Sequence, residues 1–145
     1  MRLRSLLFVP GDRPERFAKA AASGADALIL DLEDSVAPER KGAARDAVRS
    51  YLAGERAVTV FVRVNPLGSA YIADDLTAIC DARPDSLVLP KAEGAASVTA
   101  LAQQAPGVSV LPIATETPAA IFQLGSYGQV AHQLLGLTWG AEDLP

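Results

Sequence analysis

The chain has 145 residues, of which 50% are hydrophobic and 6% aromatic, and its formal net charge is −4. This length fits one domain rather than two, and the hydrophobic content excludes a disordered chain. The basic residues form no run, which argues against nucleic-acid binding, and the single Cys80 excludes an internal disulfide or a cysteine zinc cluster.

Short apolar runs bounded by turn signals predict six strands. The runs are aliphatic and mostly lack polar alternation, which is typical of strands buried on both faces. The predicted strands cover residues 5–10, 26–32, 58–64, 86–90, 108–115 and 133–140.

Helical patterns lie between these strands. The first is expected from Asp12 to Gly24, because Asp12 and Glu15 are spaced as in a capping box and Pro14 suits the first turn. The other helices are predicted over about 38–52, around residues 72–79, around residues 98–105, and from Thr117, as the N-cap, to Gly125.

This alternation predicts an α/β fold with a parallel sheet. Two architectures are open at this point: a doubly wound sheet, and a (β/α)8 barrel, which typically needs about 250 residues. The residue pattern by itself favours the doubly wound sheet, because six strands cannot close an eight-stranded barrel.

Polar residues follow every predicted strand. In both architectures ligands bind at the carboxyl ends of parallel strands, so these residues are the candidate site. Three carboxylates follow the second strand within four positions, and they repel one another unless a cation neutralises them. The polar residues at the six ends are Asp12 and Arg13; Asp31, Glu33 and Asp34; Arg63 and Asn65; Lys91 and Glu93; Glu116; and Glu142 and Asp143.

Each of these candidates has a functional and a structural interpretation. Glu116 and Asp143 follow neighbouring strands, and two carboxylates with water suit Mg²⁺, but both could be solvated loop acids. The planar fork of Arg63 suits carboxylate binding, but it could equally form an ion pair with one of the acids after the second strand. The single histidine, His132, is predicted on the surface away from this edge, so a nucleophile would have no histidine base.

Six sequence motifs occur in order along nearly the whole chain: SLLFVPGDRPERFAKA, GADALILDLEDSVAPERK, VRVNP, LPKAE, PIATET and WGAEDL. Together they resemble the citrate lyase beta-subunit (CitE-like) family of the HpcH/HpaI aldolase superfamily. The resemblance implies a TIM (β/α)8-type barrel. Residues 1–145 would then be a single barrel domain that holds about the first six strands and five helices and is truncated before strands seven and eight.

The resemblance also implies a reaction. Members make or break a carbon–carbon bond next to a carbonyl, commonly in CoA thioesters such as citryl-, malyl- or citramalyl-CoA. It implies an Mg²⁺-dependent lyase, or the reverse synthase, whose ligands are an oxo acid such as oxaloacetate and an acyl-CoA. It further implies a homo-oligomer, a trimer or hexamer. The sequence contains no signal-peptide or membrane-span pattern, so we expect a cytoplasmic protein.

Matching positions imply roles for the acids and the arginine. Glu116 and Asp143 match Mg²⁺ ligands. Arg63 matches an arginine that binds the carboxylate of the oxo acid. Glu33 and Asp34 match an acidic pair that lines the metal pocket, and with Arg63 they are the candidate catalytic residues. Asp31 is expected to act as an outer partner of this group.

Further positions match substrate contacts. The turn of Gly140, Ala141 and Glu142 is expected to offer backbone N–H groups to the oxo acid. Basic residues near the first two helices are expected to contact the CoA phosphates, and the candidates are Arg13, Lys19 and Lys41.

Three alternatives to the lyase stay open. One is an aldolase of the same superfamily that releases pyruvate without CoA. Another is a receiver-like signalling domain, which also combines carboxylates, Mg²⁺ and a lysine on a parallel sheet. The last is a truncated barrel that binds ligands without turnover.

Overall fold

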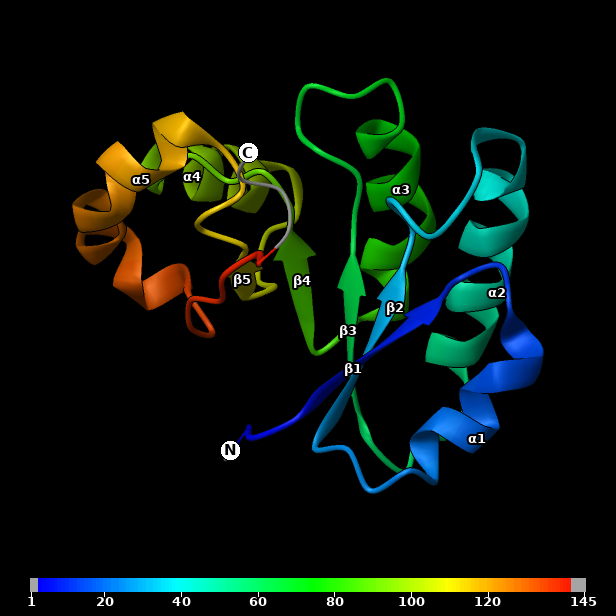
Figure 1. The fold of residues 1–145 in the computed structure, drawn as a ribbon. Helices are drawn as coiled ribbons and strands as arrows, with labels where there is room; N and C mark the ends of the chain where they lie inside the picture. The colour runs from blue at the N-terminus through cyan, green and yellow to red at the C-terminus, as the bar shows by residue number, and fades with distance from the viewer. Residues whose placement is uncertain (1–2, 142–145) are drawn as a thin grey trace.

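The computed structural model describes residues 3–141, which form one curved parallel sheet with helices along it (Figure 1). The apolar runs of the first five predicted strands form five strands close to the expected positions. These are β1 (Leu6–Pro10), β2 (Ala27–Asp31), β3 (Thr59–Arg63), β4 (Ser86–Leu89) and β5 (Val110–Pro112).

Helices follow each of the strands, as the sequence predicts. The α-helices are α1 (Phe17–Ala21), α2 (Lys41–Ala53), α3 (Ile72–Ile79), α4 (Ala95–Gln104) and α5 (Pro118–Gln123). The short 3-10 segments are η1 (Pro14–Arg16), η2 (Pro38–Arg40), η3 (Cys80–Ala82) and η4 (Leu124–Gln133).

Two helix ends differ from the prediction. The capping box at Asp12 does not form, because the Asp12 carboxylate faces Arg40 at 3.3 Å and no side chain caps η1. The fifth helix does begin at Thr117, whose hydroxyl accepts the Ala120 N–H at 3.1 Å. It does not end at Gly125, because the chain continues helically through η4.

The strand order decides between the two architectures. The strands pair in parallel in the order β1-β2-β3-β4-β5. A doubly wound sheet reverses its order at a switch point, whereas a barrel adds each strand beside the last one. The doubly wound alternative, including the receiver-like domain, is therefore wrong, and the sheet is that of a TIM-type barrel.

The sixth predicted strand is only partly confirmed. Two isolated parallel bridges join residues 133–140 to β5, Val110 with Leu134 and Ile113 with Thr138. The register shifts by one residue between these bridges, so the segment contains a bulge. Pro112 accepts the Thr138 N–H at 3.1 Å but has no N–H to return. The bulge and the proline explain why no continuous ladder forms.

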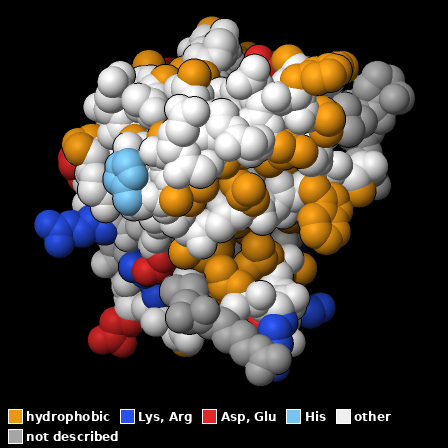
Figure 2. Space-filling view, turned by 90° about the vertical axis from the view of Figure 1, so that its left-hand side faces the viewer, with side chains coloured by type: hydrophobic (Ala, Val, Ile, Leu, Met, Phe, Trp, Pro, Cys, Tyr) orange, Lys and Arg blue, Asp and Glu red, His pale blue; other side chains and the backbone are white. Residues whose placement is uncertain are grey.

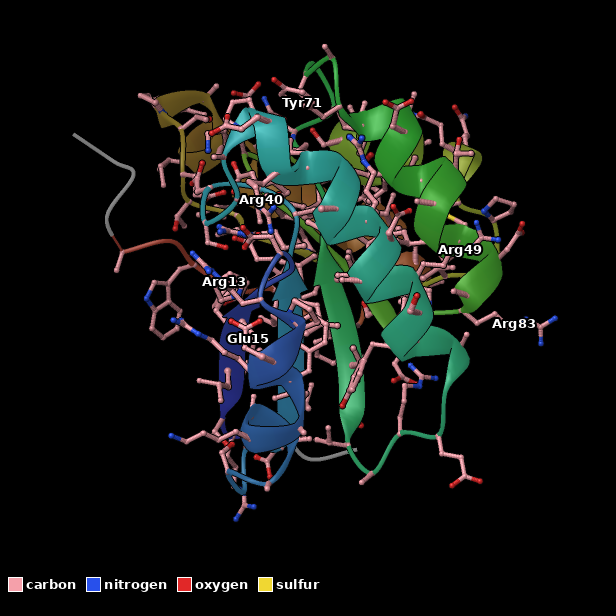
Figure 3. All side chains as sticks on the ribbon, turned by 90° about the vertical axis from the view of Figure 1, so that its right-hand side faces the viewer. Arg13, Glu15, Arg40, Arg49, Tyr71 and Arg83 are labelled. Atoms are coloured by element: carbon pink, nitrogen blue, oxygen red, sulfur yellow. The ribbon has the colours of Figure 1, made fainter. Side chains whose placement is uncertain are left out.

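Two apolar layers lie on opposite faces of the sheet. Alternate strand residues such as Leu28 and Leu30 point outward and pack under the helices. Figures 1 and 3 show α1, α2 and α3 side by side on this outer face. The residues between them, such as Ile29, point inward and form a smaller cluster with Phe61 and Val88. The inner face is the wall of the candidate site.

Several large apolar side chains are exposed. Phe8 on the inner face is 48% exposed and Trp139 is 77% exposed. Figure 2 shows hydrophobic patches on the side formed by α5 and η4, where Phe122 is 87% exposed. Exposed apolar surface is typical of interaction sites. It fits a homo-oligomer, which stays a prediction.

Three further expectations concern single features. His132 is exposed, which confirms it as a surface residue. Cys80 packs partly buried against the outer layer, and burial raises the pKa of its thiol. Between residues 3 and 141, no helix is long and apolar enough to cross a membrane.

Candidate functional site

A cavity of about 720 Å³ opens on the inner face at the carboxyl ends of the strands. We call it the central cavity. Its walls are apolar, and its polar residues come from the carboxyl end of β3, from the segments that follow β2 and β5, and from the end of the sixth predicted strand. The apolar residues are Leu6, Phe8, Ile29, Val88, Ile113 and Trp139, and the others are Asp34, Ser35, Arg63, Glu116, Thr138, Gly140 and Ala141.

Arg63 and Asp31 form a buried bidentate ion pair beside the central cavity. Parallel pairing of β2 with β3 aligns Asp31 with Arg63, so both side chains leave the sheet at the same level. Arg63 Nε lies 2.7 Å from Asp31 Oδ1, and Arg63 Nη2 lies 2.8 Å from Asp31 Oδ2. Burial alone would raise the pKa of Asp31, but the hydrogen bonds and the charge of Arg63 outweigh it and lower that pKa. Nε and Nη2 of Arg63 therefore form a structural ion pair, which is one of the two interpretations that the sequence left open.

The other edge of the guanidinium meets Glu33 and an aromatic ring. Arg63 Nη1 lies 3.0 Å from Glu33 Oε2, and the guanidinium carbon lies 4.8 Å from the centre of the Phe8 ring. A cation over an aromatic face is attracted by the ring quadrupole. Arg63 is thus held by two acids and a ring and still lines the central cavity.

Glu33 is buried between two cations. Lys91 Nζ lies 2.9 Å from Glu33 Oε1. Glu33 Oε2 is buried, and no hydrogen bond to it occurs within the described part of the chain. Burial raises the pKa of Glu33, and the hydrogen bond from Lys91 and the charge of Arg63 offset this only in part. The ion pair with Arg63, 3.0 Å from Oε2, compensates the charge of Glu33, and Oε2 can still accept a hydrogen bond.

Glu116 lies at the opposite wall, against the turn that contains Gly140. A methyl group on Gly140 would lie 2.6 Å from Glu116 Cγ, so this approach requires glycine. The Lys91 N–H donates to Glu116 Oε2 at 2.5 Å. Glu116 lines the central cavity, and its role as an Mg²⁺ ligand stays a prediction.

The predicted donors of the Gly140 turn are only partly as expected. The Gly140 N–H donates to Thr115 Oγ1 at 3.1 Å, so it is turned toward the protein and not toward a ligand. The Gly140 N–H was expected to bind the oxo acid, and this expectation is wrong because the Thr115 hydroxyl accepts the N–H instead. Ala141 lines the central cavity. Glu142 and Asp143 lie outside the described residues.

The carboxylates at the central cavity fit a hard cation. Glu116 and Asp34 both line it, and Glu33 forms an ion pair with Arg63, which lines it as well. Mg²⁺ prefers oxygen ligands and usually takes only one or two carboxylates from a protein, with water completing its shell. Within residues 3–141, no group of three or more His, Cys, Asp or Glu side chains gathers around one point. The two carboxylates that line the cavity, Glu116 and Asp34, match the number of protein ligands that Mg²⁺ usually takes.

Lys41 is placed differently from the expectation of a phosphate contact. Its side chain is buried, and Nζ donates to the carbonyl oxygens of Leu32 at 2.8 Å and Glu33 at 3.1 Å. Burial lowers the pKa of Lys41. The ammonium therefore supports the main chain that carries Glu33, and it does not point to solvent.

A second buried network supports the same turn, and sequence reasoning missed it. Asn65 Nδ2 donates to the Leu32 carbonyl at 2.8 Å and to Asp75 Oδ2 at 2.7 Å. Arg45 Nε binds the other oxygen of Asp75 at 2.8 Å. The spacing of Lys41 and Arg45, four residues apart on α2, puts both on one helix face and could have indicated a shared partner.

Basic side chains also occur on the segments that follow β1 and β2, and we call this region the outer rim. Arg13 and Lys19 are exposed, as a contact to an anionic ligand requires. Arg40, which sequence reasoning missed, binds Asp12 at 3.3 Å, and Arg13 lies 3.9 Å from the same acid. Figure 3 shows Arg13 and Arg40 on the same side of the molecule, from the segments after β1 and β2.

Comparison with known protein families gives a match over nearly the whole chain. The family model described as HpcH/HpaI aldolase/citrate lyase matches residues 4–144. A citrate lyase subunit beta-like protein of Mycobacterium tuberculosis is 45% identical over 139 residues, which are 95% of this chain and 47% of that protein. A (3S)-malyl-CoA thioesterase of Cereibacter sphaeroides is 34% identical over 145 residues, which are 97% of this chain and 50% of that protein.

Solved structures match the fold. The citrate lyase beta subunit of M. tuberculosis complexed with oxaloacetate and magnesium superposes with a TM-score of 0.83 at 42% identity, covering 96% of this chain and 58% of that one. The protein CitE of the same organism, in complex with magnesium, acetoacetate and coenzyme A, superposes with a TM-score of 0.82 at 42% identity, covering 96% and 49%. The chain spans about half the length of the curated relatives it matches.

Proposed function

The chain belongs to the HpcH/HpaI aldolase/citrate lyase family, and from this premise we propose that its central cavity binds Mg²⁺ and an oxo acid. We propose further that it supports a carbon–carbon lyase reaction, or the reverse synthesis, on a 3-hydroxy acyl-CoA such as citryl-, malyl- or citramalyl-CoA. The observation that carries the proposal is one cavity that combines Arg63 with Glu116 and Asp34.

The metal would be held by Glu116, and Asp143 is the second proposed ligand. Mg²⁺ bound there would polarise the carbonyl of the oxo acid as a Lewis acid. Glu33 and Asp34 would accept hydrogen bonds from water around the metal, because Glu33 has a buried oxygen without a hydrogen bond and Asp34 lines the cavity. The oxo-acid complexes of the relatives support this choice of ligand class.

Arg63 would bind the carboxylate of the oxo acid. A guanidinium has five N–H groups, and the hydrogen bonds to Asp31 occupy two of them. The N–H groups that remain would reach a carboxylate in the central cavity, which Arg63 lines. The buried pair with Asp31 would fix the orientation of the guanidinium before the ligand arrives.

The CoA moiety would lie along the outer rim. Its phosphates need cations, and the exposed Arg13 and Lys19 are the proposed contacts. Arg40 joins them because it shares Asp12 with Arg13. Lys41 is left out, because its ammonium is bound to main-chain carbonyl groups inside the protein.

Product analysis tests the reaction. We expect malyl-, citramalyl- or citryl-CoA, incubated with the protein and Mg²⁺, to yield an oxo acid and a shorter acyl-CoA. Free CoA and the intact hydroxy acid would instead indicate a thioesterase, as the C. sphaeroides relative is named. Pyruvate released from a hydroxy-oxo acid without CoA would indicate the aldolase alternative. No product from any of these substrates, with ligand binding retained, would indicate a barrel that binds ligands without turnover.

A further inference from the structure

Lys91 has a main-chain conformation that lysine rarely adopts. It follows β4, and its φ of 52° lies in the left-handed region. Side chains with a Cβ are strained there, and glycine or asparagine is the usual choice. Non-glycine residues in this region cluster at functional sites when the surrounding structure holds them there.

The contacts of Lys91 explain what the conformation achieves. Its N–H donates to Glu116 Oε2 at 2.5 Å, and its Nζ donates to Glu33 Oε1 at 2.9 Å. The two acids come from the ends of β5 and β2, which are not neighbours in the sheet. A single residue after β4 therefore donates hydrogen bonds to two carboxylates that follow two separate strands.

Arg83 has a similar left-handed main-chain conformation and can be compared with Lys91. It is the other non-glycine residue between residues 3 and 141 with a positive φ, at 54°. It ends η3, where its N–H donates to the Cys80 carbonyl at 3.1 Å. Figure 3 shows Arg83 projecting away from the body of the molecule. The left-handed turn at Arg83 thus has main-chain contacts with Cys80 and Arg56, whereas the turn at Lys91 places a cation between two acids.

We propose that Lys91 is a positioning residue that links Glu33 to Glu116, which lines the central cavity. Its main-chain N–H orients Glu116, and its side-chain ammonium orients Glu33. The functional part of this inference rests on the proposed binding of Mg²⁺ and an oxo acid. The contact between Lys91 and Glu33 does not, because it is a hydrogen bond between two side chains of the protein.

Four variants separate a positioning role from a role in the turn. Lys91→Gly removes the side chain, keeps the N–H and relieves the left-handed strain. Arg83→Gly relieves the same strain far from the cavity and is the matched control. Lys91→Arg keeps a cation. Glu33→Gln removes the charge that Lys91 contacts.

The first readout needs no ligand. We expect the change in melting temperature caused by Lys91→Gly to differ between the parent and the Glu33→Gln background, because the two residues interact. Arg83→Gly should shift the melting temperature equally in both backgrounds. Equal shifts for Lys91→Gly as well would overturn the proposal.

The second readout is calorimetric titration of oxaloacetate in the presence of Mg²⁺. We expect Lys91→Gly to weaken binding about tenfold, the lower range for losing an outer partner of a metal site, with affinity largely restored in Lys91→Arg and unchanged in Arg83→Gly. Unchanged affinity in Lys91→Gly would overturn the proposal. If the parent itself binds no oxaloacetate, the proposed function fails, and the first readout still decides whether Lys91 positions Glu33.

Discussion

Replacing Arg63 with methionine is expected to lower the free energy of unfolding by about 3–5 kcal/mol, because it leaves the buried Asp31 carboxylate without its cation. Asp31 is only 1% exposed, and Arg63 binds both of its oxygens. The Glu33 N–H and the Ser35 N–H, at 2.9 and 3.0 Å, would remain as donors, but neither carries a charge. Urea unfolding at neutral pH measures the difference.

Two control variants make this result specific. Arg63→Lys keeps the charge and loses the fork, so a smaller loss of about 1–3 kcal/mol is expected. Arg63→Met combined with Asp31→Asn removes both charges and should be more stable than Arg63→Met alone. A single methionine variant that unfolds within about 1 kcal/mol of the parent would contradict the account.

The same pair predicts the direction of a pH effect. The pKa of Asp31 is lowered in the folded protein, so the pair contributes its full stability above the unfolded pKa of about 3.9. That contribution is lost as the pH falls through the folded pKa. The stability difference between the parent and Arg63→Met should therefore be largest near neutral pH and shrink in acid.

Replacing Glu116 with glutamine is expected to reduce Mg²⁺ affinity by more than about tenfold, which is the lower limit for losing even an outer partner of a metal site. Glutamine has nearly the same shape, and its carbonyl oxygen could still accept the Lys91 N–H, so the fold should be retained. Calorimetric titration with Mg²⁺ measures the affinity, and the melting temperature checks the fold.

Glu93→Gln is the matched control for this experiment. It makes the same charge change at an exposed acid that accepts the Thr117 hydroxyl at 2.8 Å. Mg²⁺ affinity should be unchanged in this variant. Equal affinities in the parent and Glu116→Gln, or equal losses in both variants, would remove Glu116 as the ligand.

Much of the fold was predictable because its signals are local. Strands buried on both faces have continuous apolar runs, and the N-cap at Thr117 needs only residues three positions apart. Strand order depends on how distant segments pack, so the residue pattern alone favoured the wrong architecture and only the family resemblance corrected it. The bulge in residues 133–140 depends on pairing with Pro112, which also lies outside any local signal.

The residues of the site also divide into those with local sequence signals and those whose contacts depend on how distant segments pack. Acids and cations at the strand ends were predictable because parallel strands bring their carboxyl ends to one edge. The partners were not, since Lys41 and Asn65 bind the carbonyl group of Leu32 only after α2 and β3 pack around that turn. Lys41 therefore looked like a solvent-exposed helix charge in the sequence and is a buried main-chain contact in the structure.

The most direct test of the central claim is calorimetric titration of oxaloacetate into the protein with and without Mg²⁺. We expect binding at one site that requires Mg²⁺ and is weakened in Glu116→Gln. Binding that is equally strong without Mg²⁺, or no binding in either condition, would contradict an oxo-acid site built on Mg²⁺, Glu116 and Arg63.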